Sequence, residues 1–272
     1  MNYRHAFHAG NFADCMKHAT LVWLLRALMR KPAPLFVLDT HAGVGRYDLD
    51  NGPAARTGEW QNGIAKLLDD PPPPLADYVG LVRSLGLYPG SPTIIGGLLR
   101  PDDRLACCEL QSDDAAALRR LFAHNRQVAV HHRDAWEALG ALLPPRHRRG
   151  LVLIDPPFED PQEFAELADG LALGQPRFST GVFAAWYPIK HRAPSRQFLT
   201  ELRESGIRDI VTVEFCLREP VDPARLNGCG MLVINPPHRF EEEVPSILAA
   251  LLDRLGSREA GESATVRRLV DE

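Results

Sequence analysis

The stretch LFVLDTHAGVG (residues 35–45) decides the fold, because it joins a short apolar strand directly to a turn of small residues. A continuous apolar run is typical of a strand that is buried on both faces of a parallel sheet. Glycines such as Gly43 let the backbone turn tightly and approach a ligand at the carboxyl end of the strand. Taken alone, the pattern fits a tight turn without a ligand equally well, since many strand-to-helix turns look similar.

Six further apolar segments follow, and helical periodicity separates several of them. The strands are expected at residues 35–39, 105–110, 127–132, 151–155, 180–187, 209–217 and 231–235. Helices are expected at residues 14–30, 113–124, 161–173, 195–205 and 244–255. This alternation predicts an α/β fold with a mostly parallel seven-stranded sheet and helices on both faces.

Residues 46–100 interrupt the alternation of strands and helices. A crossover between adjacent parallel strands needs about a dozen residues or somewhat more, and this segment is far longer and includes four consecutive prolines at 71–74. We interpret it as a small helical subdomain inserted after the first strand. The charged tail beyond Gly256 is expected to be partly loose.

Composition and charge narrow the class of protein. The chain has 272 residues, is 45% hydrophobic and 24% charged, and carries a formal net charge of -4, which excludes a disordered chain. No run of about 18 apolar residues is present, so no membrane-spanning helix is expected, and the first residues lack the apolar core of a secretory signal. Five scattered cysteines do not make a disulfide framework, so we expect a cytoplasmic protein.

The acidic total argues against a uniformly basic nucleic-acid binder, but the distribution of charge is uneven. Residues 1–31 hold five basic side chains and only one acid, Asp14, which predicts a basic N-terminal segment beside the site. Arg146-His147-Arg148-Arg149 forms a second basic cluster. For this cluster an RNA contact and a solvated loop remain equally open.

Polar residues stand at the ends of consecutive predicted strands. Glu109 ends the second strand, where a carboxylate can accept both ribose hydroxyls of a nucleoside cofactor, and Asp134 follows the third, where it can accept from an adenine amine. Each taken singly also fits a common helix N-cap acid. Because the carboxyl ends of parallel strands meet at one edge of a sheet, the series predicts a single crevice.

Asp155-Pro156-Pro157-Phe158 follows the fourth strand and is the most specific motif in the chain. The two prolines fix the backbone, so that the Asp155 carboxylate and a neighbouring carbonyl can accept the two hydrogens of an exocyclic amine. Phe158 offers an aromatic face on which an extruded base can stack. The motif indicates methyl transfer to an amine, with a purely structural turn as the alternative.

Two other motifs are interpreted as structural. Asn235-Pro236-Pro237-His238 also follows an apolar strand, but it falls outside the ordered series and His238 is a poor stacking residue, so we predict a structural turn or rim feature. Cys15-Met16-Lys17-His18 has metal-like spacing, but no second ligand pair matches it, so no metal site is expected.

Taken in order along the chain, the glycine-rich turn at residues 39–45, Glu109, Asp134 and the Asp155 motif resemble those of the class I S-adenosylmethionine-dependent methyltransferases. More narrowly, the chain is similar to the RlmJ family of bacterial 23S ribosomal RNA adenine-N6 methyltransferases. The family resemblance rests on the segments YRHAFHAGNFADCMKH (3–18), LDTHAGVGRYDL, RTGEW, YPGSP (88–92), RRGLVLIDPPFE, TGVFAAWYP and GMLVINPP. It covers essentially the whole chain, including the N-terminal segment and the insertion.

The resemblance implies roles for individual residues. The positions that would contact S-adenosylmethionine are His18, His41, Ser91, Glu109, Asp134 and Ala135, together with Gly43 of the glycine-rich turn. The catalytic group would be Asp155 with Pro156, Pro157, Phe158 and Lys17, and the residues near the target base would be Tyr3, His5, Lys17 and Phe158. Two positions depart from the family, which often has Tyr at Phe158 and commonly Gly at Ala135.

The resemblance thus implies one methyltransferase domain over residues 1–272, with a substrate-facing segment at 1–31 and the inserted subdomain at about 46–100. Its substrate would be 23S ribosomal RNA or an assembly intermediate, and we expect a monomer. A DNA adenine methyltransferase, a protein glutamine methyltransferase and a catalytically idle RNA-binding or assembly factor remain alternatives. A nicotinamide-dependent reductase would explain the glycine-rich turn but not the Asp155 motif.

Overall fold

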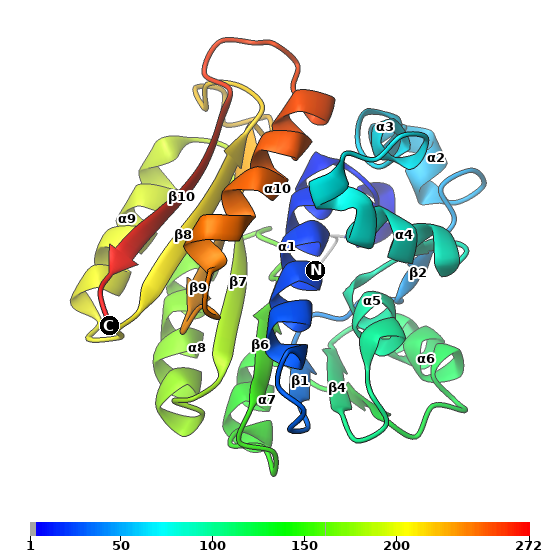
Figure 1. The fold of residues 1–272 in the computed structure, drawn as a ribbon, viewed down its shortest axis with the longest axis vertical. Helices are drawn as coiled ribbons and strands as arrows, with labels where there is room; N and C mark the ends of the chain where they lie inside the picture. Colours follow the sequence, from blue (N-terminus) through cyan, green and yellow to red (C-terminus); the bar gives the residue numbers. More distant parts are fainter. Residues whose placement is uncertain (1–3, 161) are drawn as a thin grey trace.

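A computed structural model describes residues 4–160 and 162–272 and is built around one sheet (Figure 1). The strand order is β10-β8-β9-β7-β6-β1-β4-β5. The strands are β1 (Phe36–Asp39), β4 (Arg104–Glu109), β5 (Val128–His132), β6 (Gly150–Ile154), β7 (Val182–Ile189), β8 (Ile210–Cys216), β9 (Gly228–Ile234) and β10 (Ser263–Val270). All pairings from β5 across to β7 are parallel, whereas β9 is antiparallel to both β7 and β8.

The number of strands differs from the sequence prediction, because the sheet has eight strands rather than seven. The tail predicted to be partly loose forms β10, which pairs antiparallel with β8 at the edge of the sheet. Its exposed arginine Arg268 forms an ion pair with Asp209 at 2.7 Å. Charged side chains are common on edge strands, where they discourage pairing with other chains. Here they interrupt the alternation of apolar residues, so the sequence pattern did not predict a strand.

Helices cover both faces of the sheet (Figure 1). One core is built between the sheet and α1 (Phe12–Met29), α5 (Ser91–Leu98) and α10 (Phe240–Leu255), and a second core lies under α7 (Ala135–Leu142), α8 (Glu163–Arg177) and α9 (Arg192–Glu204). Successive strand side chains point to opposite faces, so Val37 packs in the first core and Leu38 in the second. Helix α6 (Ser112–Leu121) contacts β4 and β5.

Helix α1 is buried on nearly every side. The Asn11 side chain caps it by accepting from the backbone N–H groups of Ala13 and Asp14. Thirteen of its 18 residues are buried, because the sheet covers one side and α5, α10 and the insertion cover the others. The first half of the helix therefore has no polar face, and its charged side chains lie inside the protein.

The segment between β1 and α5 folds beside the N-terminal half of α1 (Figure 1). Its elements are β2 (Arg46–Tyr47), α2 (Pro53–Thr57), η2 (Glu59–Asn62), α3 (Ala65–Leu68), η3 (Pro73–Leu75), α4 (Ala76–Ser84) and β3 (Tyr88–Pro89), with β2 and β3 paired antiparallel. Helix α5 then forms the crossover to β4. Among the described residues, no helix combines the length and the apolar character that a membrane span requires.

The insertion also holds the N-terminal segment that contains η1 (His5–Phe7). The Thr57 hydroxyl donates to the Phe7 carbonyl, and the Ile64 N–H donates to the Gly10 carbonyl at 2.9 Å. Glu59 accepts a hydrogen bond from Asn11 at 3.0 Å and lies 2.9 Å from the His8 ring. These contacts place residues 5–14 over the carboxyl edge of the sheet.

Candidate active site

A cavity of about 860 Å³ lies along the carboxyl ends of β5, β4, β1, β6 and β7. Connections leave β1 in one direction across the sheet and β6 in the other, and ligands of open α/β sheets bind at such a switch point. Of the predicted site residues, Tyr3 lies outside the described part of the chain. All the others line this one cavity: His5, Lys17, His18, His41, Gly43, Ser91, Glu109, Asp134, Ala135, Asp155, Pro156, Pro157 and Phe158.

Glu109 fastens the glycine-rich turn. One of its carboxylate oxygens accepts the Gly43 N–H at 2.8 Å, and the other accepts the Gln111 N–H at 2.7 Å. Gly43 has a φ of +60°, and a Cβ there would lie 2.6 Å from the Tyr47 hydroxyl. The position therefore requires glycine, and the fixed carboxylate keeps lone pairs available for hydroxyl groups in the cavity.

Asp134 caps a helix, as one reading of its position suggested, and it also lines the cavity. One oxygen, Oδ1, caps α7 by accepting the N–H groups of Trp136 at 2.9 Å and Glu137 at 3.0 Å. The residue also lines the cavity together with the buried Ala135. A helix cap and a cavity acceptor are therefore compatible at this residue.

Asp39, at the end of β1, is a buried carboxyl that the sequence reasoning did not assign to the site. Ser91 donates to its Oδ2 at 2.7 Å, and Oδ1 has no hydrogen-bond partner among the described residues. Burial raises the pKa of Asp39 to about 7, although the Ser91 hydrogen bond opposes this shift. Ser91 thus lines the cavity and, at the same time, donates a hydrogen bond to the Asp39 carboxyl.

Two histidines of the cavity, the buried His18 and the partly buried His41, are neutral at physiological pH. Burial lowers the pKa of His18 to about 3 and that of His41 to about 4. His18 lies 3.0 Å from the Tyr88 hydroxyl, and the Nδ1 of His41 lies 2.8 Å from the Thr40 hydroxyl. Both rings therefore act as neutral hydrogen-bonding groups.

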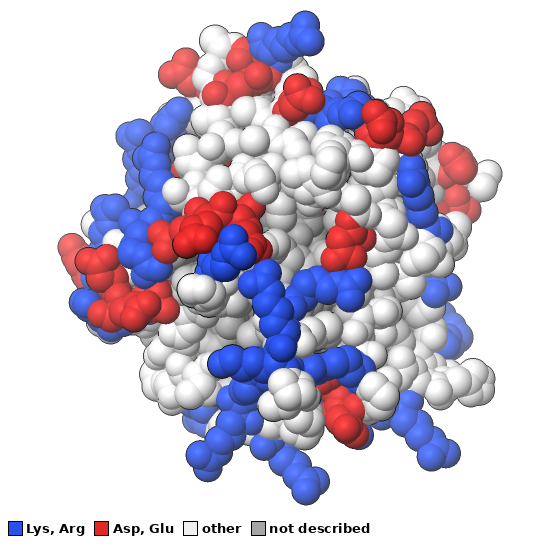
Figure 2. Space-filling view, viewed as in Figure 1, with Lys and Arg blue, Asp and Glu red and all other residues white. Residues whose placement is uncertain are grey.

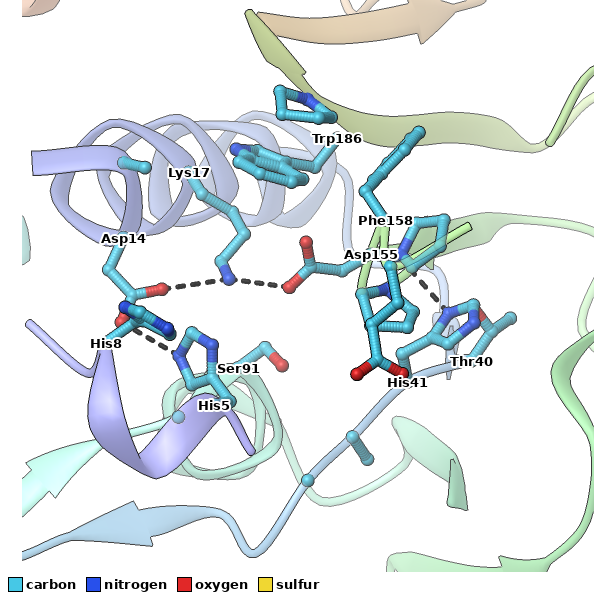
Figure 3. Close-up of a pocket in the computed structure, with 18 of the residues that line it drawn as sticks. His5, His8, Asp14, Lys17, Thr40, His41, Ser91, Asp155, Phe158 and Trp186 are labelled. Carbon is cyan, nitrogen blue, oxygen red and sulfur yellow. Dashed lines mark hydrogen bonds and ion pairs between the residues drawn. The ribbon is translucent and has the colours of Figure 1, made fainter. Parts of the chain in front are cut away.

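The Asp155 motif forms a rigid corner after β6 (Figure 3). The Asp155 N–H donates to His41 Nδ1 over 3.4 Å. Phe158 has a φ of +53°, a left-handed conformation that costs energy for a bulky residue and is characteristic of functional sites. Its ring packs against Phe164 and Trp186, with ring centroids 4.7 and 5.9 Å away. Figure 3 shows Phe158 and Trp186 on one side of the Asp155 carboxylate.

Lys17 reaches Asp155 from helix α1. Its Nζ lies 2.6 Å from Asp155 Oδ2 and 2.9 Å from Asp14 Oδ1, so the ammonium sits between two carboxylates (Figure 3). His5 Nε2 lies 3.0 Å from Asp14 Oδ2. The sequence identified Lys17, His5 and Asp155 but missed Asp14 and Trp186, because no motif shows which neighbours of a helix or strand face a cavity.

The second proline motif is structural, as predicted. Strand β9 runs antiparallel to β7, so its last residue lies at the opposite edge of the sheet from Asp155. The Asn235 side chain donates to the carbonyls of Ser179 at 2.9 Å and Gly181 at 2.7 Å. Asn235 is thus used to fasten the turn before β7.

The prediction of a basic N-terminal segment beside the site is confirmed only in part, because Lys17 lies in the cavity and Arg4 acts on the cavity residue Asp114. By contrast, Arg26 and Arg30 stand toward the far end of α1, where they pair with Asp77 and Glu243 at 2.8 and 2.9 Å. At 1.5 Å per helical residue, Arg30 is roughly 20 Å along the helix from Lys17. Figure 2 shows Lys and Arg side chains gathered around this end of α1.

The cluster at 146–149 also lies at the amino edge of the sheet. Arg149, just before β6, donates to the carbonyls of Leu28 at 2.8 Å and Ala33 at 3.0 Å. One of the four residues therefore braces the loop after α1. Arg146 and Arg148 are exposed at the edge opposite the cavity.

Comparison with known proteins agrees with this geometry. The family model described as ribosomal RNA large subunit methyltransferase D, RlmJ, matches residues 32–268. Ribosomal RNA large subunit methyltransferase J of Escherichia coli (strain K12) is 39% identical over 280 residues, with 100% of both chains covered. The protein of the same name from Haemophilus influenzae is 39% identical over 264 residues, with 94% of each covered.

A solved structure gives the same result. Protein LPL1258 from Legionella pneumophila superposes with a TM-score of 0.87 at 36% sequence identity, covering 96% of this chain and 98% of that one. The strand order and these matches establish the class I, Rossmann-like methyltransferase fold predicted from the sequence. The chain therefore belongs to the RlmJ family of ribosomal RNA large subunit methyltransferases.

Proposed function

We propose that this chain transfers a methyl group from S-adenosylmethionine to N6 of an adenine in 23S ribosomal RNA. Family membership supports methylation of large-subunit ribosomal RNA. The observation that carries the finer proposal is the Asp155 carboxylate, which borders the cavity at a rigid Pro-Pro-Phe corner and lines the same cavity as Glu109.

The cavity suits S-adenosylmethionine in size and in the chemistry of its walls. Ligand cavities are commonly about 300–1,000 Å³, so about 860 Å³ leaves room for a cofactor and part of a substrate. We assign the ribose hydroxyls to Glu109 and the adenine to Asp134 beside the Ala135 floor. The amino acid end would lie near Ser91 and Asp39, whose Oδ1 is buried without a hydrogen-bond partner among the described residues.

When bound, S-adenosylmethionine supplies a methyl group that is electrophilic because it is attached to a sulfonium. The protein's own residues then orient the acceptor, since such a displacement needs an in-line approach. Asp155 and the Pro156 carbonyl would accept the two hydrogens of the adenine amine and so favour a pyramidal nitrogen with an available lone pair. The carboxylate also stabilises the positive charge that develops on this nitrogen.

The substrate half of the cavity suits a flipped base. Phe158 and Trp186 supply aromatic surface beside Asp155, and base stacking on such residues is worth about 1–3 kcal/mol per base. His5 and Lys17 also line this half of the cavity. A base inside a helix cannot reach such a site, so we propose that the adenine is turned out of its stack.

We further propose that the enzyme works as a cytoplasmic monomer on 23S RNA or an assembly intermediate. The decisive experiment compares the wild type with Asp155→Ala and Asp155→Asn on unmodified 23S RNA. Mass spectrometry of RNA fragments should identify N6-methyladenine with the wild type only. Undiminished transfer by either variant would refute the role of Asp155, and a different methylated product would refute the N6 assignment.

Competition with DNA and protein acceptors separates this proposal from other amine methyltransferases. Only RNA is expected to accept the methyl group at a useful rate. Calorimetry with S-adenosylmethionine separates it from an idle assembly factor, which has no need to bind that cofactor.

A further inference from the structure

A chain of four charged or titratable side chains crosses the substrate half of the cavity. It runs from His5 to Asp14 at 3.0 Å, from Asp14 to Lys17 at 2.9 Å, and from Lys17 to Asp155 at 2.6 Å. The proposed function uses three of these residues and leaves Asp14 without a role. Figure 3 shows Asp14 at the start of α1, on the far side of the Lys17 ammonium from Asp155.

The orientation of the Asp14 carboxylate is fixed by its contacts. Oδ2 accepts the Gly10 N–H at 2.9 Å and contacts His5 Nε2, which leaves Oδ1 directed at Lys17. The side chains of Asp14 and Lys17 are only 2% and 6% exposed. They are also three positions apart on one helix, a spacing that brings side chains together. The pair is therefore a buried ion pair of fixed geometry within the site and not a mobile ion pair on the surface.

Burial makes this arrangement electrostatically demanding. Burial lowers the pKa of Lys17, but the carboxylates of Asp14 and Asp155 outweigh it and hold that pKa well above its usual range. Burial raises the pKa of Asp14, and His5 and Lys17 reverse this effect, so that it lies well below its usual range. Removing one member of such a buried pair leaves the other charge uncompensated, which is strongly unfavourable.

In this structure Lys17 occupies an oxygen of Asp155 that the target amine would need. An incoming amine competes with the ammonium for Oδ2, and the nitrogen then gains positive charge near an existing cation. With Asp14 as a second partner, Lys17 stays paired when Asp155 turns to the base. We propose that Asp14 is a positioning residue for methyl transfer, which holds the Lys17 ammonium and frees Asp155 for the acceptor amine; this rests on the proposed function.

The test is the isosteric variant Asp14→Asn, assayed for methyl transfer to unmodified 23S RNA under single-turnover conditions. A hydrogen bond to a charged group is worth about 1.5–3 kcal/mol, so the rate constant should fall about 10- to 150-fold. The KM for RNA should change little. Because Asp14 acts through Lys17, the double variant Asp14→Asn with Lys17→Met should be no slower than Lys17→Met alone.

A pH profile gives a readout that a merely structural role would not move. The titratable groups that face Lys17 are Asp14 and His18 on α1, Asp39 at the end of β1, Asp155 after β6, and Cys229 on β9. In Asp14→Asn the ammonium keeps its burial but loses one carboxylate, so its pKa falls. The change in rate that accompanies loss of the Lys17 charge should therefore begin at a lower pH than in the wild type, and Asp14→Glu should restore the wild-type pH dependence.

Asp103→Asn is the matched control. Asp103 is also a buried carboxyl, accepting the Leu35 N–H at 2.8 Å and pairing with Arg100 at 2.9 Å, but it lies at the amino edge of the sheet. The Asp103→Asn variant should be less stable than the wild type and should leave the pH profile of methyl transfer unchanged. Any effect that it has on the rate should add to that of Lys17→Met. The proposal is wrong if the pH profile of Asp14→Asn superimposes on that of the wild type. It is also wrong if the effects of Asp14→Asn and Lys17→Met on the rate are independent of each other.

A measurement on the wild type covers the case in which Asp14→Asn does not fold. The side-chain ¹⁵N resonance of Lys17 should remain that of an ammonium beyond the ordinary lysine pKa of about 10.4, and titration near that value would overturn the proposal. Product analysis keeps the two hypotheses apart. If the methyl group is found on another RNA atom, the N6 assignment fails, whereas the coupling of Asp14 to Lys17 is still measured on that product.

Discussion

Glu109 accepts the backbone N–H of Gly43 at 2.8 Å, so the last residue of β4 is fastened to the turn that follows β1. The bond joins two strand ends that are 66 residues apart in the chain. It gives Glu109 two tasks, which are to shape the turn and to present a carboxylate to the cavity.

Replacing Glu109 with Gln should therefore weaken binding of S-adenosylmethionine. A hydrogen bond to a charged group contributes about 1.5–3 kcal/mol, so the Kd should rise about 10- to 150-fold. Isothermal titration calorimetry measures this directly. Asp113→Asn, an exposed acid in the first turn of the neighbouring helix α6, is the control and should bind normally. Equal affinities for all three proteins would contradict the assignment of Glu109.

Gly43→Ala should destabilise the fold by roughly 1–3 kcal/mol, because the residue is held in a left-handed conformation. The new Cβ would also meet the Tyr47 hydroxyl, so Tyr47→Phe should recover part of the loss. Urea unfolding checks both effects. Gly80→Ala, in α4 with no atom within 4 Å of the added Cβ, should instead stabilise by about 0.5–1 kcal/mol. A Gly43→Ala variant with the same free energy of unfolding as the wild type would show that the turn is not constrained.

Asp39 should make stability fall as pH rises from about 4 to about 7. Burial raises its pKa to about 7, so over this range the folded protein binds a proton that the unfolded chain has released. The stabilisation is complete below the unfolded pKa of about 4 and is lost by about pH 7, at up to about 1.4 kcal/mol per pH unit. The free energy of unfolding of Asp39→Asn, relative to that of the wild type, should thus increase up to about pH 7 and then level off.

Urea unfolding at a series of pH values tests this expectation. Ser91→Ala serves as a control, because loss of the hydroxyl that favours the ionised carboxyl should move the plateau to higher pH. Parallel curves for the wild type and Asp39→Asn would mean that Asp39 does not titrate in this range.

Phe158→Ala should impair use of RNA while leaving cofactor binding intact. Stacking on an aromatic ring contributes about 1–3 kcal/mol per base, so kcat/KM for 23S RNA should fall about 5- to 150-fold. Phe158→Tyr keeps the ring and should stay within a few-fold of the wild type. Fluorescence of 2-aminopurine at the target position reports extrusion of the base. A Phe158→Ala enzyme with wild-type kinetics would place the stacking surface elsewhere.

Sequence reasoning located the strand-end residues because parallel strands carry their last residues to one edge. Gly43, Glu109, Asp134 and Asp155 each follow a recognisable apolar run, and topology alone brings them to one cavity. Whether they act as assigned stays a prediction.

Contacts across elements were harder to predict. Asp14 resembles any acid in the first turn of a helix, and only the packing of α1 against the insertion buries it beside Lys17. Basic residues that are close in sequence were separated because an 18-residue helix spans about 27 Å. Strand β10 was missed because its pairing with β8 is set by tertiary structure and not by its own apolar content.

The contacts from the insertion to residues 5–14 have a thermodynamic consequence. Thr57, Glu59 and Ile64 hold the N-terminal segment, whereas Gly43 and Glu109 belong to the turn and strand ends of the sheet. Local unfolding of the insertion would release His5 and the cap of α1 without breaking the strand pairings. The free energy of that local opening, rather than global stability, would then set the temperature at which the protein loses the proposed RNA half of the cavity while the proposed cofactor half stays intact.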